Sequence, residues 1–412
     1  MRFRFLAFTL LIFAASLPVV GEQYRKPKIR AITASVRIDP SQRLQPVQDA
    51  LPFLRRAKEA FEKAGYQVQT LRITTQPFVQ YIAGRSMNEN VAFFQSLDAL
   101  AEKESFLFNI GPLTVGTPSD PGNVELLTQV LPLTWANATV VVADENGVQW
   151  NAIRAAAKIV KYLEAHSRNG TSNFNFAAVA MVPPNTPFFP GSNHDGPGHQ
   201  FSVGWEAGNF VTDVLKGAKQ DWPRAKTSLS EAFEQQARVV DAIATQLERS
   251  SDWKYMGLDP TPAPNSDSSI GAAIEELTGG KFGSSGTLTA AALITEAERS
   301  ITVKRVGYSG LMVPVLEDPI LAQRWAEGTY DLDSLLAYSA VCGTGLDAIP
   351  LPGDVTQEQL ERIMSDMASL AFRWKKPLTA RLIPAPGKKA GDRTDFDFAV
   401  GQFPNTTLRV VH

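Results

Sequence analysis

The sequence predicts an α/β protein in which strands alternate with helices. Segments rich in β-branched residues recur between segments whose apolar residues follow helical spacing, which favours a parallel sheet with crossover helices, wound as an open sheet or a barrel. Residues 174–182 (FNFAAVAMV) are almost wholly apolar, as a strand buried on both faces would be. No linker, low-complexity run or simple repeat divides the chain, so we expect a single domain over residues 22–412.

Local signals place the elements of the first half. Residues 29–38 (IRAITASVRI) are β-branched and bounded by Pro40, which predicts a strand. Residues 46–64 have helical spacing and stop at Gly65, but the regular helix is expected to begin at Pro46 or only at Pro52. By the same signals we expect strands at 66–74, 106–110, 138–143 and 174–182, and helices at 88–104 and 150–166.

The second half continues this alternation. A long helix is expected at 228–249, followed by a short strand at 255–258. Later helices are expected at 270–277, 287–299, 334–341 and 356–374, with strand-like segments at 347–350 and 378–383.

The N-terminus has the pattern of a secretory signal peptide over residues 1–21. Arg2 and Arg4 precede an uncharged apolar run at 5–17, and Val19 and Gly21 are small enough for a cleavage site. A membrane span needs about 20 apolar residues, so this run is too short to be one. The sequence therefore predicts a secreted or periplasmic protein; the alternative is an uncleaved N-terminal anchor.

Composition narrows the function classes. The net charge is −2 with no basic or acidic block, which argues against nucleic acid and against an electrostatic membrane partner. The single cysteine, Cys342, excludes an internal disulfide, a zinc–thiolate cluster and an iron–sulfur cluster. A small molecule is the expected partner; the mature chain is not expected on a membrane, and a homo-oligomer stays open.

A polar segment at 183–208 gathers candidate ligands between glycines and prolines. His194, Asp195 and His199 can converge on a divalent ion, because imidazole and carboxylate suit zinc, manganese or iron. Pro197 and the glycines exclude a helix there. Glu206 lies near the end of the segment as a catalytic candidate. The alternative is a surface loop in which these side chains only stabilise turns.

Asp259 and Cys342 are candidates on stiff or glycine-rich segments. Asp259 is expected at a strand end, before a proline-rich loop at 257–269, where a carboxylate can serve as a general base or a metal ligand. The alternative is a turn that leads into the next helix, with Ser268 or Ser269 as its N-cap. Cys342 is flanked by glycines and followed by Asp347; it is either a nucleophile or a small buried hydrophobic residue.

A glycine-rich group precedes the helix at 287–299. Gly286 and Thr287 open that helix, whose free N–H groups could hold an anion or a cofactor. The alternative is a plain helix cap. No phosphate-binding lysine motif and no dinucleotide-binding glycine motif follows a strand here, so no nucleotide cofactor is predicted.

Several of these stretches resemble the UPF0210 (DUF711) family of uncharacterised proteins. The residues that carry the resemblance are LDPTPA at 258–263, GT at 286–287, YSGLMVPV at 308–315, CGTGLD at 342–347 and TARLIP at 379–384. The resemblance implies a large barrel of about ten strands in two parallel halves with outer helices, similar to the barrel of the glycyl-radical enzymes. It assigns no reaction. Members are usually cytosolic, so the export signal is a departure, as are His199 and Trp205-Glu206.

The residues argue against radical chemistry itself. A glycyl-radical site has Arg-Val, a small residue and then Gly-Tyr or Gly-Phe near the C-terminus, whereas Arg305-Val306-Gly307-Tyr308 lacks the small residue and lies about 100 residues from the end. Export would also expose such a radical to oxygen.

Two functional hypotheses follow. The first is an exported enzyme of hydrolase or lyase type that acts on a small polar molecule in a barrel-end cavity, with or without a divalent metal ion. Its catalytic candidates are Asp259, Asp347, Cys342 and Glu206, and its metal ligands would be His194, Asp195 and His199. The second is a non-catalytic periplasmic small-ligand-binding protein, with Phe188, Phe189 and Trp205 as candidate walls.

Overall fold

The computed structural model describes residues 24–115, 121–397 and 403–411, and contains a sheet of ten strands. The predicted signal peptide lies outside these residues. The strands are β1 (Lys28–Val36), β2 (Val68–Thr75), β3 (Leu107–Thr114), β4 (Asn137–Asp144), β5 (Gly147–Val148), β6 (Phe176–Ala180), β7 (Gln200–Glu206), β8 (Lys254–Ala263), β9 (Gly345–Pro352) and β10 (Leu378–Ala385).

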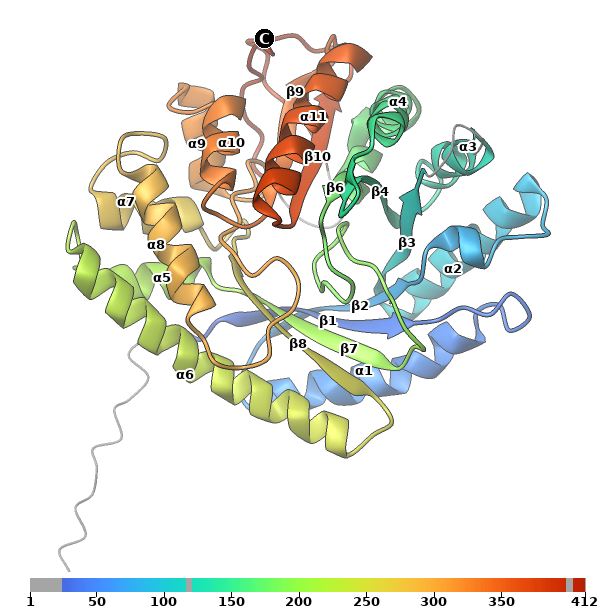
Figure 1. Cartoon of the computed structure of the whole chain (residues 1–412), viewed down its shortest axis with the longest axis horizontal. Helices are drawn as coiled ribbons and strands as arrows, with labels where there is room; N and C mark the ends of the chain where they lie inside the picture. Colours follow the sequence, from blue (N-terminus) through green and yellow to red (C-terminus); the bar gives the residue numbers. More distant parts are fainter. Residues whose placement is uncertain (1–23, 116–120, 398–402, 412) are drawn as a thin grey trace, which may run out of the picture.

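Helices surround the curved sheet on its outer side (Figure 1). They are α1 (Gln45–Lys63), α2 (Met87–Glu104), α3 (Pro121–Val130), α4 (Trp150–His166), α5 (Gly208–Leu215), α6 (Trp222–Arg249), α7 (Ile270–Thr278), α8 (Thr287–Arg299), α9 (Pro319–Glu327), α10 (Leu332–Ser339) and α11 (Gln357–Trp374), with short 3₁₀ turns η1 (Phe78–Gln80) and η2 (Arg168–Asn175). In the described part of the chain, every helix is too short or too polar to cross a membrane.

The sheet has two strand directions. Its order is β8-β7-β1-β2-β3-β4-β6-β10-β9, with the short β5 paired to β4. The central strands β1, β2, β3, β4 and β6 are parallel to one another. The pairs β7–β8 and β9–β10 are each parallel, and they join the central strands through antiparallel contacts with β1 and β6. An α/β architecture with about ten strands is therefore confirmed.

The two ends of the sheet, β8 and β9, do not pair with each other among the described strands. Backbone hydrogen bonds instead connect each of them to residues 304–316. On one side Leu258 N–H donates to Lys304 O (2.9 Å), and on the other Val315 N–H donates to Asp347 O (3.1 Å). The sheet is thus not closed by a continuous strand ladder, and the predicted closed barrel stays a prediction.

The two faces of the sheet differ in polarity, because successive side chains of a strand point to opposite sides. In β1, Ile32 and Ala34 face outward and belong to the main hydrophobic core that the helices share. Thr33 and Ser35 face inward, where their hydroxyls donate to residues of the loop after β6. In β2, Arg72 is buried among polar inward-facing neighbours. The inner side of the curved sheet is therefore polar although it is buried.

The segment predicted as one polar loop, residues 183–208, has two parts. Its first part enters the inside of the sheet: Asn109 Nδ2 donates to Pro190 O (2.6 Å) and His194 N–H donates to Thr75 O (3.2 Å). Its second part is the strand β7, every residue of which is buried. The prediction was wrong for β7, because the glycines and prolines end at Gly198 and the following aromatic and β-branched residues pair with β1.

Prolines end neither α1 nor β8. Helix α1 already begins at Gln45, and Pro52 lies within it on an exposed position. Asp259 does not end its strand, because β8 continues through Pro260 and Pro262 to Ala263. A missing N–H is tolerated there since β8 is the last strand of the ladder and needs regular partners on one side only.

Candidate functional site

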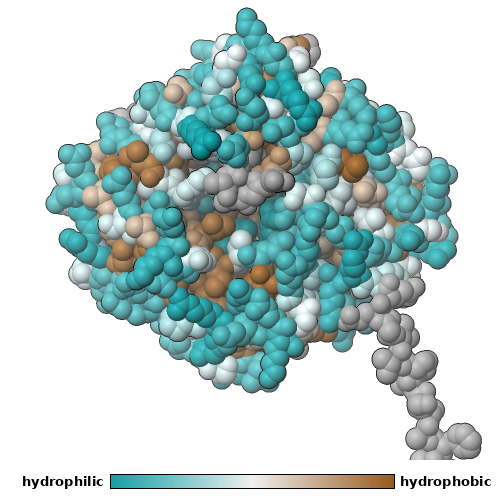
Figure 2. Space-filling view, turned by 180° about the vertical axis from the view of Figure 1, so that it is seen from behind, coloured by the Kyte–Doolittle hydropathy of each residue, from teal (hydrophilic) through white to brown (hydrophobic). Residues whose placement is uncertain are grey.

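A cavity of about 450 Å³ lies on the polar inner side of the sheet. Its lining comes from the starts of β1 to β4, from η2, from the end of β8, from β9 and β10, and from the loops that carry Phe188 and Tyr308. On the face shown in Figure 2 most of the surface is hydrophilic, and hydrophobic side chains show mainly in small patches around the centre. A cavity of this size is in the usual range for a small-molecule site.

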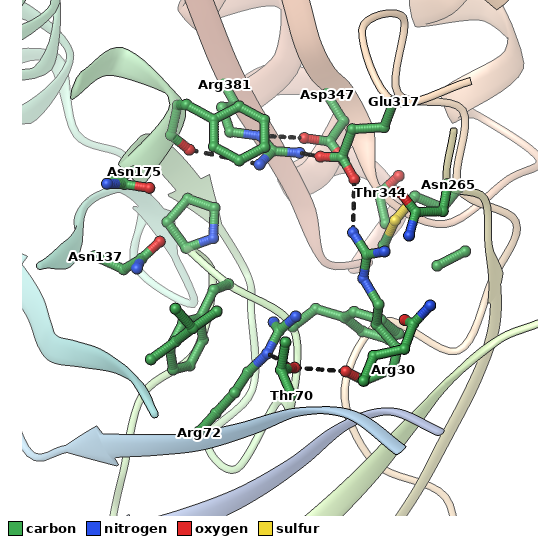
Figure 3. Close-up of a pocket in the computed structure, with 18 of the residues that line it drawn as sticks. Arg30, Thr70, Arg72, Asn137, Asn175, Asn265, Glu317, Thr344, Asp347 and Arg381 are labelled. Carbon is green, nitrogen blue, oxygen red and sulfur yellow. Dashed lines mark hydrogen bonds and ion pairs between the residues drawn. The ribbon is translucent and has the colours of Figure 1, made fainter. Parts of the chain in front are cut away.

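A buried ion-pair cluster forms one wall of the cavity (Figure 3). Arg381 of β10 donates through Nη2 to Glu317 and through Nε to Asp347 Oδ1 (2.7 Å). Arg30 of β1 reaches the other oxygen of Glu317 (3.0 Å). All of these groups except Arg30, which is partly exposed, are nearly inaccessible to solvent. Strands β1, β9 and β10, together with the turn before α9 that carries Glu317, thus hold two carboxylates with two guanidinium groups.

The pKa values of the two carboxylates in this cluster are shifted in opposite directions. Burial raises the pKa of Asp347, and Arg381 offsets only part of that effect because Glu317 adds a second negative charge. Burial acts on Glu317 in the same direction, but Arg381 and Arg30 outweigh it and the pKa of Glu317 is lowered. Asp347 is therefore the carboxyl that takes up a proton more readily.

Polar side chains with few partners form the opposite wall. Arg72 of β2 is 6% exposed, and its guanidinium points into the cavity in Figure 3. Asn137 at the start of β4 and Asn175 at the end of η2 also line the cavity, and in Figure 3 they lie on its left side. Phe188 and Phe189, predicted as walls of a binding site, line the cavity as well. Trp205 does not, because it faces the outer core beside Phe233.

Among the catalytic candidates, Asp347 lines the cavity and Glu206 lies next to its margin. Glu206 is 2% exposed at the end of β7. It accepts from Gln69 Nε2 (2.6 Å), and it pairs with Lys28 (3.0 Å) and Arg30 (3.4 Å). Arg30 thus connects Glu206 to the ion-pair cluster.

Asp259 is fully buried, but it is not among the residues that line the cavity. Its oxygens accept from the Thr261 hydroxyl (2.6 Å) and from the N–H groups of Thr261, Tyr308 and Ser309. Burial raises its pKa to about 6 although these donors favour the ion. Gly307 leaves room for it, since a Cβ there would lie 2.0 Å from Asp259 Oδ2. This carboxylate orders the turn that carries Tyr308.

Cys342 is fully buried in the main core. Burial raises the pKa of its thiol to about 11, whereas a nucleophilic thiol needs a lowered pKa. The nearby Lys376 donates to the backbone oxygens of Cys342 and Ser339. The structure thus places Cys342 as a packed residue behind β9.

The predicted metal ligands His194, Asp195 and His199 do not line the cavity, and they do not converge on a common point. His194 is 2% exposed, and burial lowers its pKa. Asp195 is exposed. His199 is also exposed, where it stacks on Trp253 and bonds through Nδ1 to Asp252 (2.8 Å). No three His, Cys, Asp or Glu side chains of the described residues converge closely enough to hold a metal ion, so this ligand set is not assembled.

The predicted cofactor-binding pair, Gly286 and Thr287, begins α8. Gly286 is its N-cap with a left-handed backbone (φ 101°), and Thr287 is buried with its hydroxyl accepting from Gly283 N–H (3.0 Å). Neither residue lines the cavity. The observed contacts are those of a helix cap.

The cavity residues that the sequence did not single out are Arg30, Arg72, Glu317 and Arg381, with Asn137 and Asn175. A signal was present: Arg381 interrupts a mainly apolar strand, Arg72 lies between Leu71 and Ile73, and arginine is rarely buried without a partner. What they pair with depends on strand order, which local patterns do not reveal.

Comparison with known proteins places the chain among relatives of similar length. The model of the family described as "Uncharacterised ACR (DUF711)" matches residues 23–397. A UPF0210 protein of Pyrobaculum arsenaticum is 30% identical over 92% of this chain and 90% of its own length. Those of Pyrobaculum aerophilum and Methanococcoides burtonii are 28% and 26% identical, covering 92% and 86% of this chain and 90% and 82% of their own lengths. The chain therefore belongs to the UPF0210 (DUF711) family.

Proposed function

We propose that this chain is an exported enzyme that acts on a small polar molecule inside the cavity. The observation that carries the proposal is the cavity itself: about 450 Å³ of space on the inner side of the sheet, between Arg72 on one wall and the buried cluster of Arg381, Glu317 and Asp347 on another. A buried polar group costs free energy unless it forms hydrogen bonds or ion pairs. The polar groups that line this cavity are accessible to a bound molecule. Closure of the sheet into a barrel by residues 304–316 is part of the proposal and is supported by their backbone bonds to β8 and β9.

Asp347 is the proposed general acid–base. Its pKa is raised by burial, and Arg381 is its side-chain donor in the described part of the chain. A carboxyl with a raised pKa beside a fixed cation can pass a proton to or from a bound molecule, while Arg381 stabilises negative charge that develops there. This chemistry suits hydrolysis or elimination, the reaction types proposed from the sequence.

A non-catalytic binding protein is the second candidate. Phe188 and Phe189, which line the cavity, favour it because aromatic walls with a few polar groups are typical of ligand-binding sites. The substitution Asp347→Asn distinguishes the two candidates. In an enzyme it should abolish turnover of the bound molecule and preserve its affinity, whereas in a binding protein it should change the affinity only.

The proposal can be tested by filling the cavity. Small organic acids, alcohols, amides and sugars would be screened for thermal stabilisation of the wild type, Asn175→Trp and Met312→Trp, which fill the cavity from two segments. Asn151→Trp, on the exposed surface of α4, is the matched control. We expect stabilising compounds for the wild type and the control, and none for the filled variants. Equal stabilisation of all four proteins, or of none, would overturn the proposal.

A further inference from the structure

Arg72 is a buried cation with only neutral partners. Its Nε donates to Thr70 Oγ1 (2.9 Å), its Nη1 reaches Pro187 O at 3.5 Å, and its guanidinium lies 5.0 Å from the ring centre of Phe189. No carboxylate of the described residues forms an ion pair with it. Burial lowers the pKa of Arg72, the positive charges of Arg30 and Arg381 reinforce this effect, and the negative charge of Glu317 opposes it.

The other two arginines of the cavity are fully paired. Arg381 holds Asp347 and Glu317, and Arg30 holds Glu317 and Glu206. Among the residues that line the cavity, three guanidinium groups face two carboxylates, which leaves one positive charge in excess. At the margin of the cavity, the negative charge of Glu206 is matched by Lys28. Protonation of Asp347 would add to that excess. The side chain that carries the uncompensated charge is Arg72.

Neutral hydrogen-bonding groups lie around the same space. Asn175 is 6% exposed and lines the cavity. Thr344 is 1% exposed, and its hydroxyl lacks a partner within the described ranges. An unsatisfied buried polar group costs about 1–3 kcal/mol, so such groups are expected to meet a ligand or water.

We infer that Arg72 is the anchor for the carboxylate of a small monoanionic ligand; this rests on the proposed function and names its substrate class. One excess charge matches one negative charge, whereas a phosphate dianion would need a second unpaired cation. A planar guanidinium also matches a carboxylate through two parallel hydrogen bonds. Asn175 and Thr344 supply further donors, and the Phe188 and Phe189 side chains accept the apolar part of the molecule.

The experiment compares small carboxylates with the uncharged amides of the same size, and with inorganic phosphate. Acetate and acetamide, benzoate and benzamide, phenylacetate and phenylacetamide, and inorganic phosphate would be titrated calorimetrically into the wild type, Arg72→Met, Arg72→Lys and Arg168→Met. Arg168 is the control, since its side chain is 85% exposed. We expect the wild type and control to prefer the carboxylates, with about 10- to 100-fold weaker binding to Arg72→Met and an intermediate loss for Arg72→Lys.

Thermal unfolding without ligand distinguishes this role from a structural one. Because Arg72 is an uncompensated buried charge, Arg72→Met should unfold at the wild-type temperature or a few degrees above it, whereas loss of a structural ion would lower the midpoint. Equal affinity for carboxylates and amides, unchanged binding by Arg72→Met, or binding of phosphate alone would overturn the inference and leave the cavity proposal standing. Failure of every compound in the cavity-filling screen would instead remove the proposed function.

Discussion

Two groups of buried titratable side chains differ in what lies beside them. Arg72, Asp347 and Arg381 face open space on the inner side of the sheet, whereas Asp259, Glu298 and His194 are packed in the protein away from it. Burial perturbs the pKa values of both groups, so a perturbed pKa by itself does not mark a site. The difference that matters is unoccupied space next to an incompletely satisfied polar group.

The largest effect is expected for Arg381→Met. It leaves the buried Glu317 and Asp347 without their shared cation, which should lower the free energy of unfolding by about 3–5 kcal/mol. Urea denaturation monitored by circular dichroism measures it. Arg238→Met, which removes an exposed pair with Glu234, should cost less than about 1 kcal/mol. Similar losses in the two variants would show that the cluster is not a buried ion-pair network.

Asp259→Ala is expected to act on stability rather than on ligand binding. It removes the acceptor of four hydrogen bonds, including those from Tyr308 and Ser309, and should cost about 3 kcal/mol. Asp195→Ala, on the exposed part of the loop, should change stability by less than about 0.5 kcal/mol. If Asp259→Ala kept its stability but lost turnover, Asp259 would be the general base instead of a structural carboxylate.

Ionisation of Glu298 in the unfolded chain should lower the free energy of unfolding as pH rises. Neither of its buried oxygens has a hydrogen-bond partner in the described ranges, and burial raises its pKa well above 4.5; Asp259 adds to this, and Arg299 and Arg305 oppose it. Below pH 4.5 it is protonated both folded and unfolded. Above that pH only the unfolded chain ionises, so the unfolding free energy should fall by about 1.4 kcal/mol per pH unit until the folded-state pKa is reached.

Urea denaturation of the wild type and Glu298→Gln between pH 4 and 8 measures this effect. The variant should lose the decline due to Glu298 and keep the smaller one due to Asp259, whose pKa of about 6 acts in the same direction up to that pH. Parallel curves for the two proteins would mean that Glu298 ionises normally in the folded state.

The smallest effect is expected for His199→Ala. His199 is exposed, where it stacks on Trp253 and bonds to Asp252, so stability should change by less than about 0.5 kcal/mol. Elemental analysis of the purified proteins tests whether His194, Asp195 and His199 bind a metal ion. We expect the same metal content in His199→Ala as in the wild type. A stoichiometric metal in the wild type that is lost in His199→Ala would restore the predicted histidine site.

Local signals predicted many elements well. Helices α4 and α8 have the predicted bounds, because an amphipathic pattern and a clear stop decide a helix within a few turns. Three further helices, α3, α5 and α9, were not predicted. Strand β7 was missed because its signal is short and follows a glycine- and proline-rich stretch. Its strand state depends on pairing with β1, more than 160 residues earlier in the chain.

The candidate site was predicted only in part. Asp347, Phe188 and Phe189 were named and line the cavity, but the conspicuous His194, Asp195 and His199 do not. Their clustering in sequence reflects a turn-rich loop. The cavity residues Arg30, Arg72 and Arg381 are single residues in three strands, and no local spacing links them.

The sequence by itself determined the α/β class, most helices, the family and the expectation of export, because each depends on composition, periodicity or short motifs. Only the tertiary structure decided which polar residues meet. Strands β1 and β10 and the turn before α9 bring Arg30, Arg381 and Glu317 together across about 350 residues, while Arg72 lines the same cavity without an ion pair among the described residues. Ion pairing and unfilled volume are relations between distant segments, so they exist only once the chain is folded.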